Sequence, residues 1–187
     1  DLLRYARHLD PLPFTDEDRQ KYAELLGAPS ASSTAAIAEP GDAETCRSLA
    51  WSLIAPGLRI ETADSEQAVK LAERAVSLAK GQSPYILQTL GVALCRAGRH
   101  ADAVATLEKA DALRIQAAVP RSAVDHAILA IARHHLGLAS DARASLGTAR
   151  ALLLAVPGEP YGREAVAEAE QALAAAATAG PPDPAHH

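Results

Sequence analysis

Aromatic residues are scarce in this chain of 187 residues: they make up 3% of it, with one Trp and one Phe, and Met and Asn do not occur at all. A β-sheet protein usually carries more aromatic and β-branched residues, so a sheet architecture is disfavoured. Apolar residues nevertheless reach 49%, and Ala dominates among them. Ala has the highest helix propensity, and its small side chain lets helices pack closely. The composition therefore predicts an all-α fold.

A clustered positive charge and long apolar runs are also missing. The net charge is −5, and phosphate binding requires a basic surface, so we expect no nucleic acid as the main partner. No run of 18 apolar residues occurs, so we expect no membrane-spanning helix and no membrane partner. The first residues resemble neither a signal peptide nor a natural start, which suggests a piece of a longer protein.

Motifs of known catalytic or metal-binding chemistry are missing as well. Cys46 and Cys95 fit neither a disulfide framework nor a metal-binding spacing, so we interpret them as reduced and partly buried in helices, which favours a cytoplasmic setting. The adjacent His134 and His135 would point about 100° apart on a helix and cannot bind one metal together. No phosphate-binding loop, His-Glu-x-x-His motif or nucleophile elbow occurs. We expect no catalysis, no metal and no cofactor.

The chain divides into four zones. Residues 1–27 are predicted to form a short helical segment, and residues 28–43 are an Ala/Ser/Pro/Gly-rich stretch that is typical of a flexible linker. Residues 44–179 read as one helix after another, and the last of these helices, about Tyr161 to Ala177, would cover the open end. Residues 180–187 are Pro-rich and are predicted to be a disordered tail.

The helical zone contains an internal repeat. Each copy has a Leu followed by a small residue in a first helix, a Gly at the turn and an Ala–Leu–Ala series in a second helix. One copy consists of Leu90, Gly91, Gly98, Ala103, Leu107 and Ala110, and the next of Leu129, Ala130, Gly137, Ala142, Leu146 and Ala149. The spacings between the equivalent alanines at 68, 103 and 142 are close to the roughly 34-residue period of helix–turn–helix repeats. Ser83, Ser122 and Ser140 are predicted to begin helices as N-caps.

These residues resemble tetratricopeptide (TPR) repeats over about Glu44 to Leu154. More narrowly, segments 49–53, 68–75 and 89–98 are similar to a bacterial variant at the C-terminal end of planctomycete-type Ser/Thr kinase or WD-repeat proteins. The resemblance implies a right-handed α-solenoid of three TPR-like helix hairpins with a C-terminal capping helix. The third repeat departs from the pattern, with Ala130 where Gly is common and Arg133 where a large apolar residue is usual.

The resemblance also implies a concave groove lined by the first helix of each pair. The candidate groove residues are Arg47, Trp51, Tyr85, Gln88, Val92, Arg96, Ile131 and His134. The alternative interpretation is that Trp51, Val92 and Ile131 are simply buried between helices. A mixed apolar groove with modest positive charge suits an extended peptide or an amphipathic helix. The carboxylate clamp of chaperone-binding TPR domains is not expected, because it uses groove Asn residues and this chain has none.

We therefore expect a non-catalytic docking module that binds a protein or peptide partner of unknown identity. Two alternatives stay open: a homodimer formed by self-association, and an accessory domain that regulates an upstream kinase in cis. A further possibility is that the N-terminal segment folds back into the groove and occupies it. The fold indicates the class of function and not the target.

Overall fold

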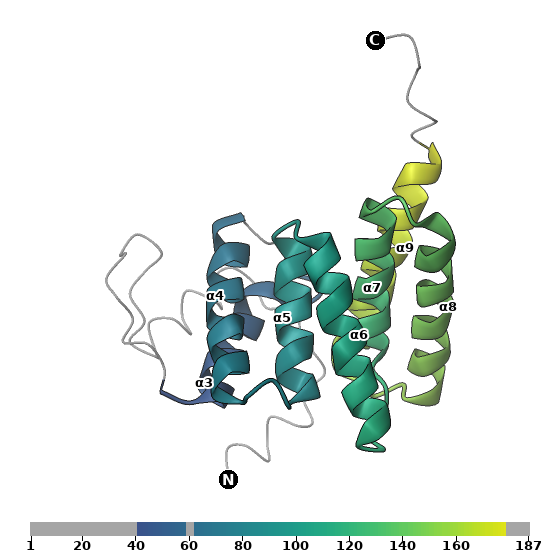
Figure 1. The fold of residues 1–187 in the computed structure, drawn as a ribbon. Coiled ribbons are helices and arrows are strands. Elements are labelled where there is room, and N and C mark those ends of the chain that lie inside the picture. Colours follow the sequence, from purple (N-terminus) through teal and green to yellow (C-terminus); the bar gives the residue numbers. More distant parts are fainter. Residues whose placement is uncertain (1–40, 59–61, 179–187) are drawn as a thin grey trace. The chain divides into compact units, whose positions relative to one another are not determined.

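The computed structural model describes residues 41–58 and 62–178, and all regular secondary structure in these residues is helical. The helices are α3 (Ala43–Ile54), α4 (Thr62–Leu78), α5 (Pro84–Arg96), α6 (His100–Gln116), α7 (Ala123–His135), α8 (Ala139–Ala155) and α9 (Gly162–Thr178). The prediction of an all-α fold is thus confirmed for this part of the chain (Figure 1). The predicted N-terminal helical segment, the linker up to residue 40 and the C-terminal tail lie outside the described residues.

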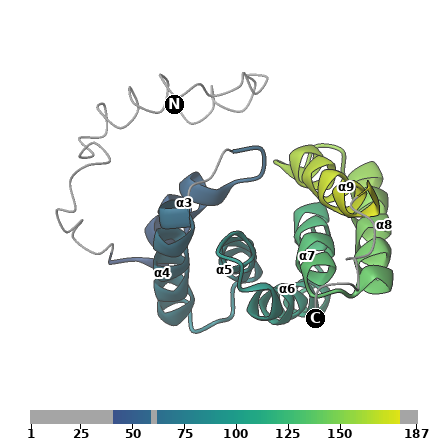
Figure 2. The ribbon, with the colours of Figure 1, turned by 90° about the horizontal axis from the view of Figure 1, so that it is seen from above.

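The described helices belong to one compact unit, in which they pair in chain order. Extensive contacts join α3 with α4, α5 with α6, and α7 with α8, which gives three consecutive hairpins. Neighbouring hairpins pack through α4 with α5 and α6 with α7, and α9 packs on α7 and α8. Figure 2 shows α5 and α7 on the inner side of α6 and α8. The first helices of the second and third hairpins therefore face the same side of the unit.

Helix ends follow the capping signals of the sequence at most positions. Ser83 and Ser122 are the N-caps of α5 and α7, and their Oγ atoms accept from Ile86 N (3.4 Å) and Asp125 N (3.3 Å). Gly98 and Gly137 have positive φ just after α5 and α7, the region that Gly adopts without steric cost. The predicted cap at Ser140 is wrong: α8 begins at Ala139, and its N-cap residue forms no side-chain capping bond.

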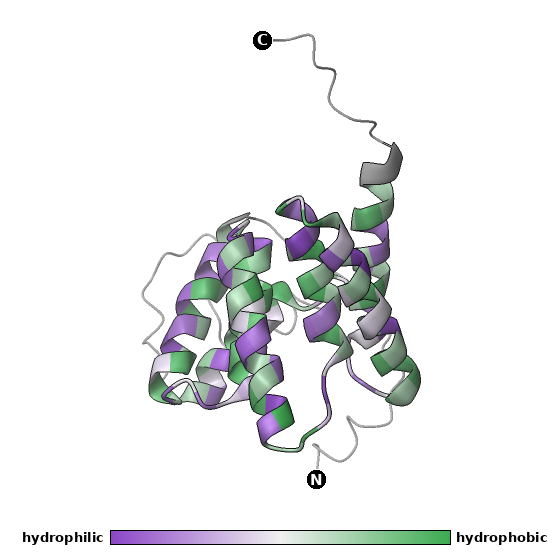
Figure 3. Ribbon diagram, turned by 45° about the vertical axis from the view of Figure 1, so that its right-hand side comes forward, coloured by the Kyte–Doolittle hydropathy of each residue, from purple (hydrophilic) through white to green (hydrophobic). Residues whose placement is uncertain are grey.

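Small residues let the helices of each hairpin approach closely. Most of the core forms one continuous cluster from α3 to α9 in which alanines such as Ala72, Ala103 and Ala149 are fully buried. At Gly91, a Cβ would lie only 2.4 Å from Leu107 Cγ, so α5 and α6 meet at a spacing that excludes any larger residue there. Figure 3 shows hydrophobic and hydrophilic residues alternating along the helices. The amphipathic pattern of the helices thus produces a continuous apolar interior.

Candidate functional site

A pocket of about 540 Å³ lies between the first helices of the hairpins and the loop that joins α8 to α9. Helix α3 contributes Arg47 and Trp51 to its wall, and α5 contributes Tyr85 and Gln88. The end of α6, the start of α7 and the α8–α9 loop complete the lining. Segments from all three hairpins therefore meet around this one cavity.

Four of the eight predicted groove residues line this pocket, namely Arg47, Trp51, Tyr85 and Gln88. The other four do not. Val92 and Ile131 are buried among the helices, as the alternative interpretation has it. Arg96 forms an ion pair with Glu168 of α9. His134, near the end of α7, is partly buried beside the ring of His135.

Aromatic rings form one side of the pocket. Trp51 meets Tyr161 edge-on, with ring centroids 5.5 Å apart and an interplanar angle of 68°. Tyr85 is 53% exposed and Tyr161 is 41% exposed. Edge-to-face pairs of this kind are stabilising, and exposed Tyr rings offer an apolar surface with a hydrogen-bonding end. This wall can accept an apolar side chain of a ligand.

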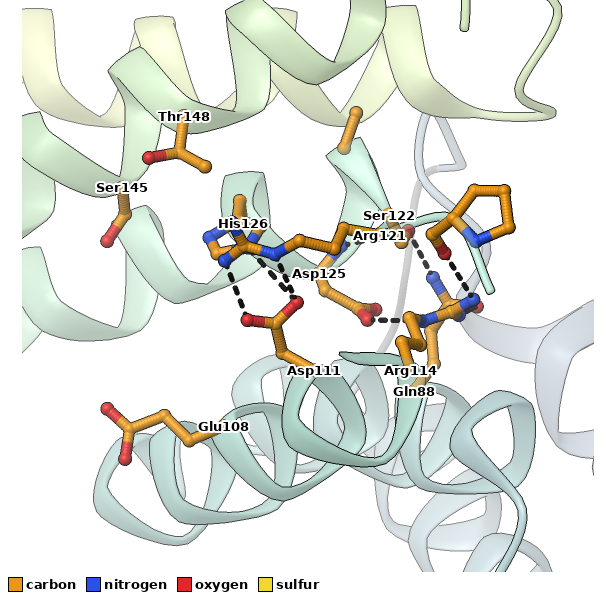
Figure 4. A network of polar contacts seen from close by, with 12 residues as sticks. Gln88, Glu108, Asp111, Arg114, Arg121, Ser122, Asp125, His126, Ser145 and Thr148 are labelled. Carbon is orange, nitrogen blue, oxygen red and sulfur yellow. Dashed lines mark hydrogen bonds and ion pairs between the residues drawn. The ribbon is translucent and has the colours of Figure 1, made fainter. Parts of the chain in front are cut away.

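The Tyr85 ring packs on Arg114, which belongs to a largely buried polar network (Figure 4). The Arg114 guanidinium lies 4.7 Å from the centroid of the Tyr85 ring. Its Nε donates to Asp125 Oδ2 (3.2 Å) and its Nη2 to Gln88 Oε1 (3.3 Å), while Gln88 Nε2 donates to Ser122 Oγ (2.8 Å). These bonds hold the Arg114 guanidinium, on which the Tyr85 ring packs, against the start of α7.

Asp125 is the most perturbed group of this network. It is fully buried, and its Oδ1 has no hydrogen-bond partner among the described residues. Burial raises the pKa of its carboxyl to about 7, against the opposing charge of Arg114. A buried carboxylate with one unsatisfied oxygen is costly, because desolvation disfavours the charged form. The carboxyl therefore titrates near neutral pH, although it lies behind the pocket wall and not in it.

A second ion pair holds the turn between α6 and α7. Arg121 donates to Asp111 through Nε (2.8 Å) and Nη2 (2.7 Å), and His126 Nε2 lies 3.5 Å from the same carboxylate. Burial would raise the pKa of Asp111, but its contacts with Arg121 and His126 lower it below the usual value. Burial lowers the pKa of His126, which favours a neutral imidazole. The group orients Arg121 at the pocket edge (Figure 4).

The α8–α9 loop is tied to the start of α7 by one carboxylate. Glu159 Oε2 accepts from Ala123 N (2.8 Å), and Glu159 Oε1 accepts from Ser122 Oγ. A carboxylate at a helix N-terminus satisfies free N–H groups and interacts favourably with the helix dipole. Glu159 and Tyr161 were not predicted as site residues, because they come from a loop whose course in space the helical repeat does not determine.

The described residues contain no cluster of three or more His, Cys, Asp or Glu side chains able to hold a metal ion. Burial raises the pKa of the Cys95 thiol to about 11, so it is protonated at neutral pH and a poor nucleophile. In the same part of the chain, no helix is both long and apolar enough to cross a membrane.

No protein-family model, no curated protein and no solved structure matches the chain. The TPR resemblance thus stays a prediction from the repeat pattern of the sequence.

Proposed function

We propose that this unit is a non-catalytic docking module, a right-handed α-solenoid of TPR type, that binds an extended peptide of a partner protein in the pocket. The observation that supports this most is the convergence of Trp51, Tyr85 and Tyr161 on one cavity. A volume of about 540 Å³ is within the size range of ligand-binding pockets. Exposed aromatic residues near a concave centre are also the commonest anchors of protein interfaces.

The hydrogen-bonding groups of the pocket favour an extended peptide over a helix. Arg47 donates to Glu44 through Nε and Nη2, and Arg121 donates to Asp111 through the same two atoms. The Nη1 atom of each arginine has no acceptor among the described residues and can therefore donate to a ligand. Glu159, a lining carboxylate, already uses both oxygens. The pocket therefore offers mainly donors. An extended peptide presents free carbonyl oxygens to such donors, whereas a helix satisfies most of its own.

A peptide selection tests this proposal. A displayed library of unstructured peptides would be selected on the protein, and the tightest peptide measured by fluorescence anisotropy. We expect Tyr85→Ala and Tyr161→Ala to weaken its binding by about tenfold or more, as for anchor residues of an interface. The matched control is Leu154→Ala, an 84% exposed residue outside the pocket. Equal losses in the three variants, or a selection without binders, would contradict the proposal.

A further inference from the structure

Helix α9 is anchored unequally on its two sides. It packs on α7 and α8, with Ala165, Val166 and Ala169 buried, whereas its backbone does not approach α3, α4 or α5 among the described helices. In Figure 2, α9 and α3 lie at opposite ends of the row of helices, with the α3–α4 connection reaching toward α9. The side chains of α9 therefore make its connection to the first two hairpins.

Glu168 makes this connection with both of its oxygens. Its Oε1 accepts a hydrogen bond from the backbone N of Gly57 in the α3–α4 connection (2.6 Å), and its Oε2 forms an ion pair with Arg96 at the end of α5. The Arg96 and Glu168 side chains are only 20% and 22% exposed. One carboxylate thus links the first hairpin, the second hairpin and the last helix.

The backbone at Gly57 is adapted to this contact. Gly57 has a φ of +86°, which L side chains rarely adopt, and a Cβ there would lie 3.3 Å from Glu164 Cγ. The aromatic contact of Trp51 with Tyr161 lies between the same two parts of the chain and forms part of the pocket wall. The Glu168 contact and the pocket wall are therefore mechanically connected.

We propose that Glu168, with Gly57 and Arg96, is a latch that holds the first hairpin against α9 and keeps the pocket in its binding-competent shape. A partly exposed ion pair, one hydrogen bond and one ring edge are each modest interactions. The latch can therefore open by a shift of the first hairpin, while α9 stays packed on α7 and α8. Opening moves Trp51 away from Tyr161 and disperses the aromatic wall. The regulatory role of the latch rests on the proposed peptide-binding function, whereas its mechanical role does not.

Distance measurements between two spin labels test the latch without any ligand. The labels are placed at the exposed positions Ser52→Cys in α3 and Arg163→Cys in α9. We expect a narrow distance distribution with Glu168 present, and a longer, broader one in Glu168→Ala. The control is Glu170→Ala, which removes an ion pair of the same helix, with Arg150, that does not reach the first hairpin. An unchanged distribution in Glu168→Ala would overturn the proposal.

Two further measurements keep the outcome unambiguous. If Glu168→Ala loses helical content, Glu168→Gln is used instead, because Gln keeps an acceptor for Gly57 N but not the charge for Arg96. We expect Glu168→Gln to lengthen the label distance as well, but by less. Peptide affinity is then compared between the wild type and the Glu168 variant. If the closed state falls to a tenth of the population, affinity drops about tenfold. No binding by the wild-type protein would refute the docking function, while the label distances would still decide the latch.

Discussion

Replacement of the buried carboxyl, Asp125→Asn, should remove a specific part of the pH dependence of stability. Burial raises the folded-state pKa of Asp125 to about 7 from an ordinary 3.8. A group whose pKa is raised by folding contributes stability below its unfolded pKa, and this contribution is lost as the pH rises through the folded pKa. Wild-type protein should therefore lose stability between pH 5 and pH 8 through this residue.

The magnitude follows from the size of the shift. Each unit of pKa difference corresponds to about 1.4 kcal/mol, and roughly two units of the shift act between pH 5 and pH 8. Wild type should thus lose about 2 to 3 kcal/mol more than Asp125→Asn over this interval. The side chain is fully buried, so solvent screening does not reduce this figure.

Urea unfolding of both proteins at pH 5, 6, 7 and 8 measures this difference directly. The contributions of other titrating groups are shared by the two proteins and cancel in the comparison. Asp141→Asn, at an exposed position of α8, serves as a control that should follow the wild type. Parallel curves for wild type and Asp125→Asn would refute the reasoning, because they would mean that the buried carboxyl does not change its protonation in this range.

The packing, capping and burial of single residues lead to three further expectations. Gly91→Ala should destabilise the protein by about 1–3 kcal/mol, because the added Cβ would overlap Leu107. Gly147→Ala, in a helix with open space around this residue, should stabilise the protein by about 0.5–1 kcal/mol. Thermal unfolding compares the two variants, and equal effects would contradict the close packing at Gly91. Ser122→Ala removes the α7 cap and a bond to Glu159, so it should cost about 1 kcal/mol or more in urea unfolding. The Cys95 thiol, buried and with a pKa of about 11, should resist alkylation at pH 8 until urea unfolds the chain; rapid labelling of folded protein would contradict its burial.

The sequence predicted helices and turns where local chemistry determines them. Ser83 and Ser122 fit N-caps, and Gly98 follows α5 with the positive φ that favours Gly. The prediction of an N-cap at Ser140 was wrong, because α8 starts one residue earlier and has no side-chain cap. Caps and glycines act within a few residues, so a single sequence shows their effect directly.

The pocket could be predicted only in part, since it depends on contacts distant in sequence. The resemblance to TPR repeats was enough to identify Tyr85 and Gln88, which line the pocket in the structure. The resemblance assigned Arg96 to the groove, whereas in the structure Arg96 forms an ion pair with Glu168 of α9. Periodicity shows that a residue is polar but not which residue it meets, so the latch and the contribution of the α8–α9 loop followed only from the structure.

The most direct test of the docking function uses the fluorescence of Trp51, the single Trp of the chain, which lines the pocket. Titration with the selected peptide, with the solution mass followed by light scattering, reports both the place of binding and self-association. We expect a saturable change of Trp51 emission, a protein that stays monomeric, and loss of both binding and emission change in Tyr85→Ala. Peptide binding without any change at Trp51, or a stable dimer that buries the pocket, would contradict the docking function.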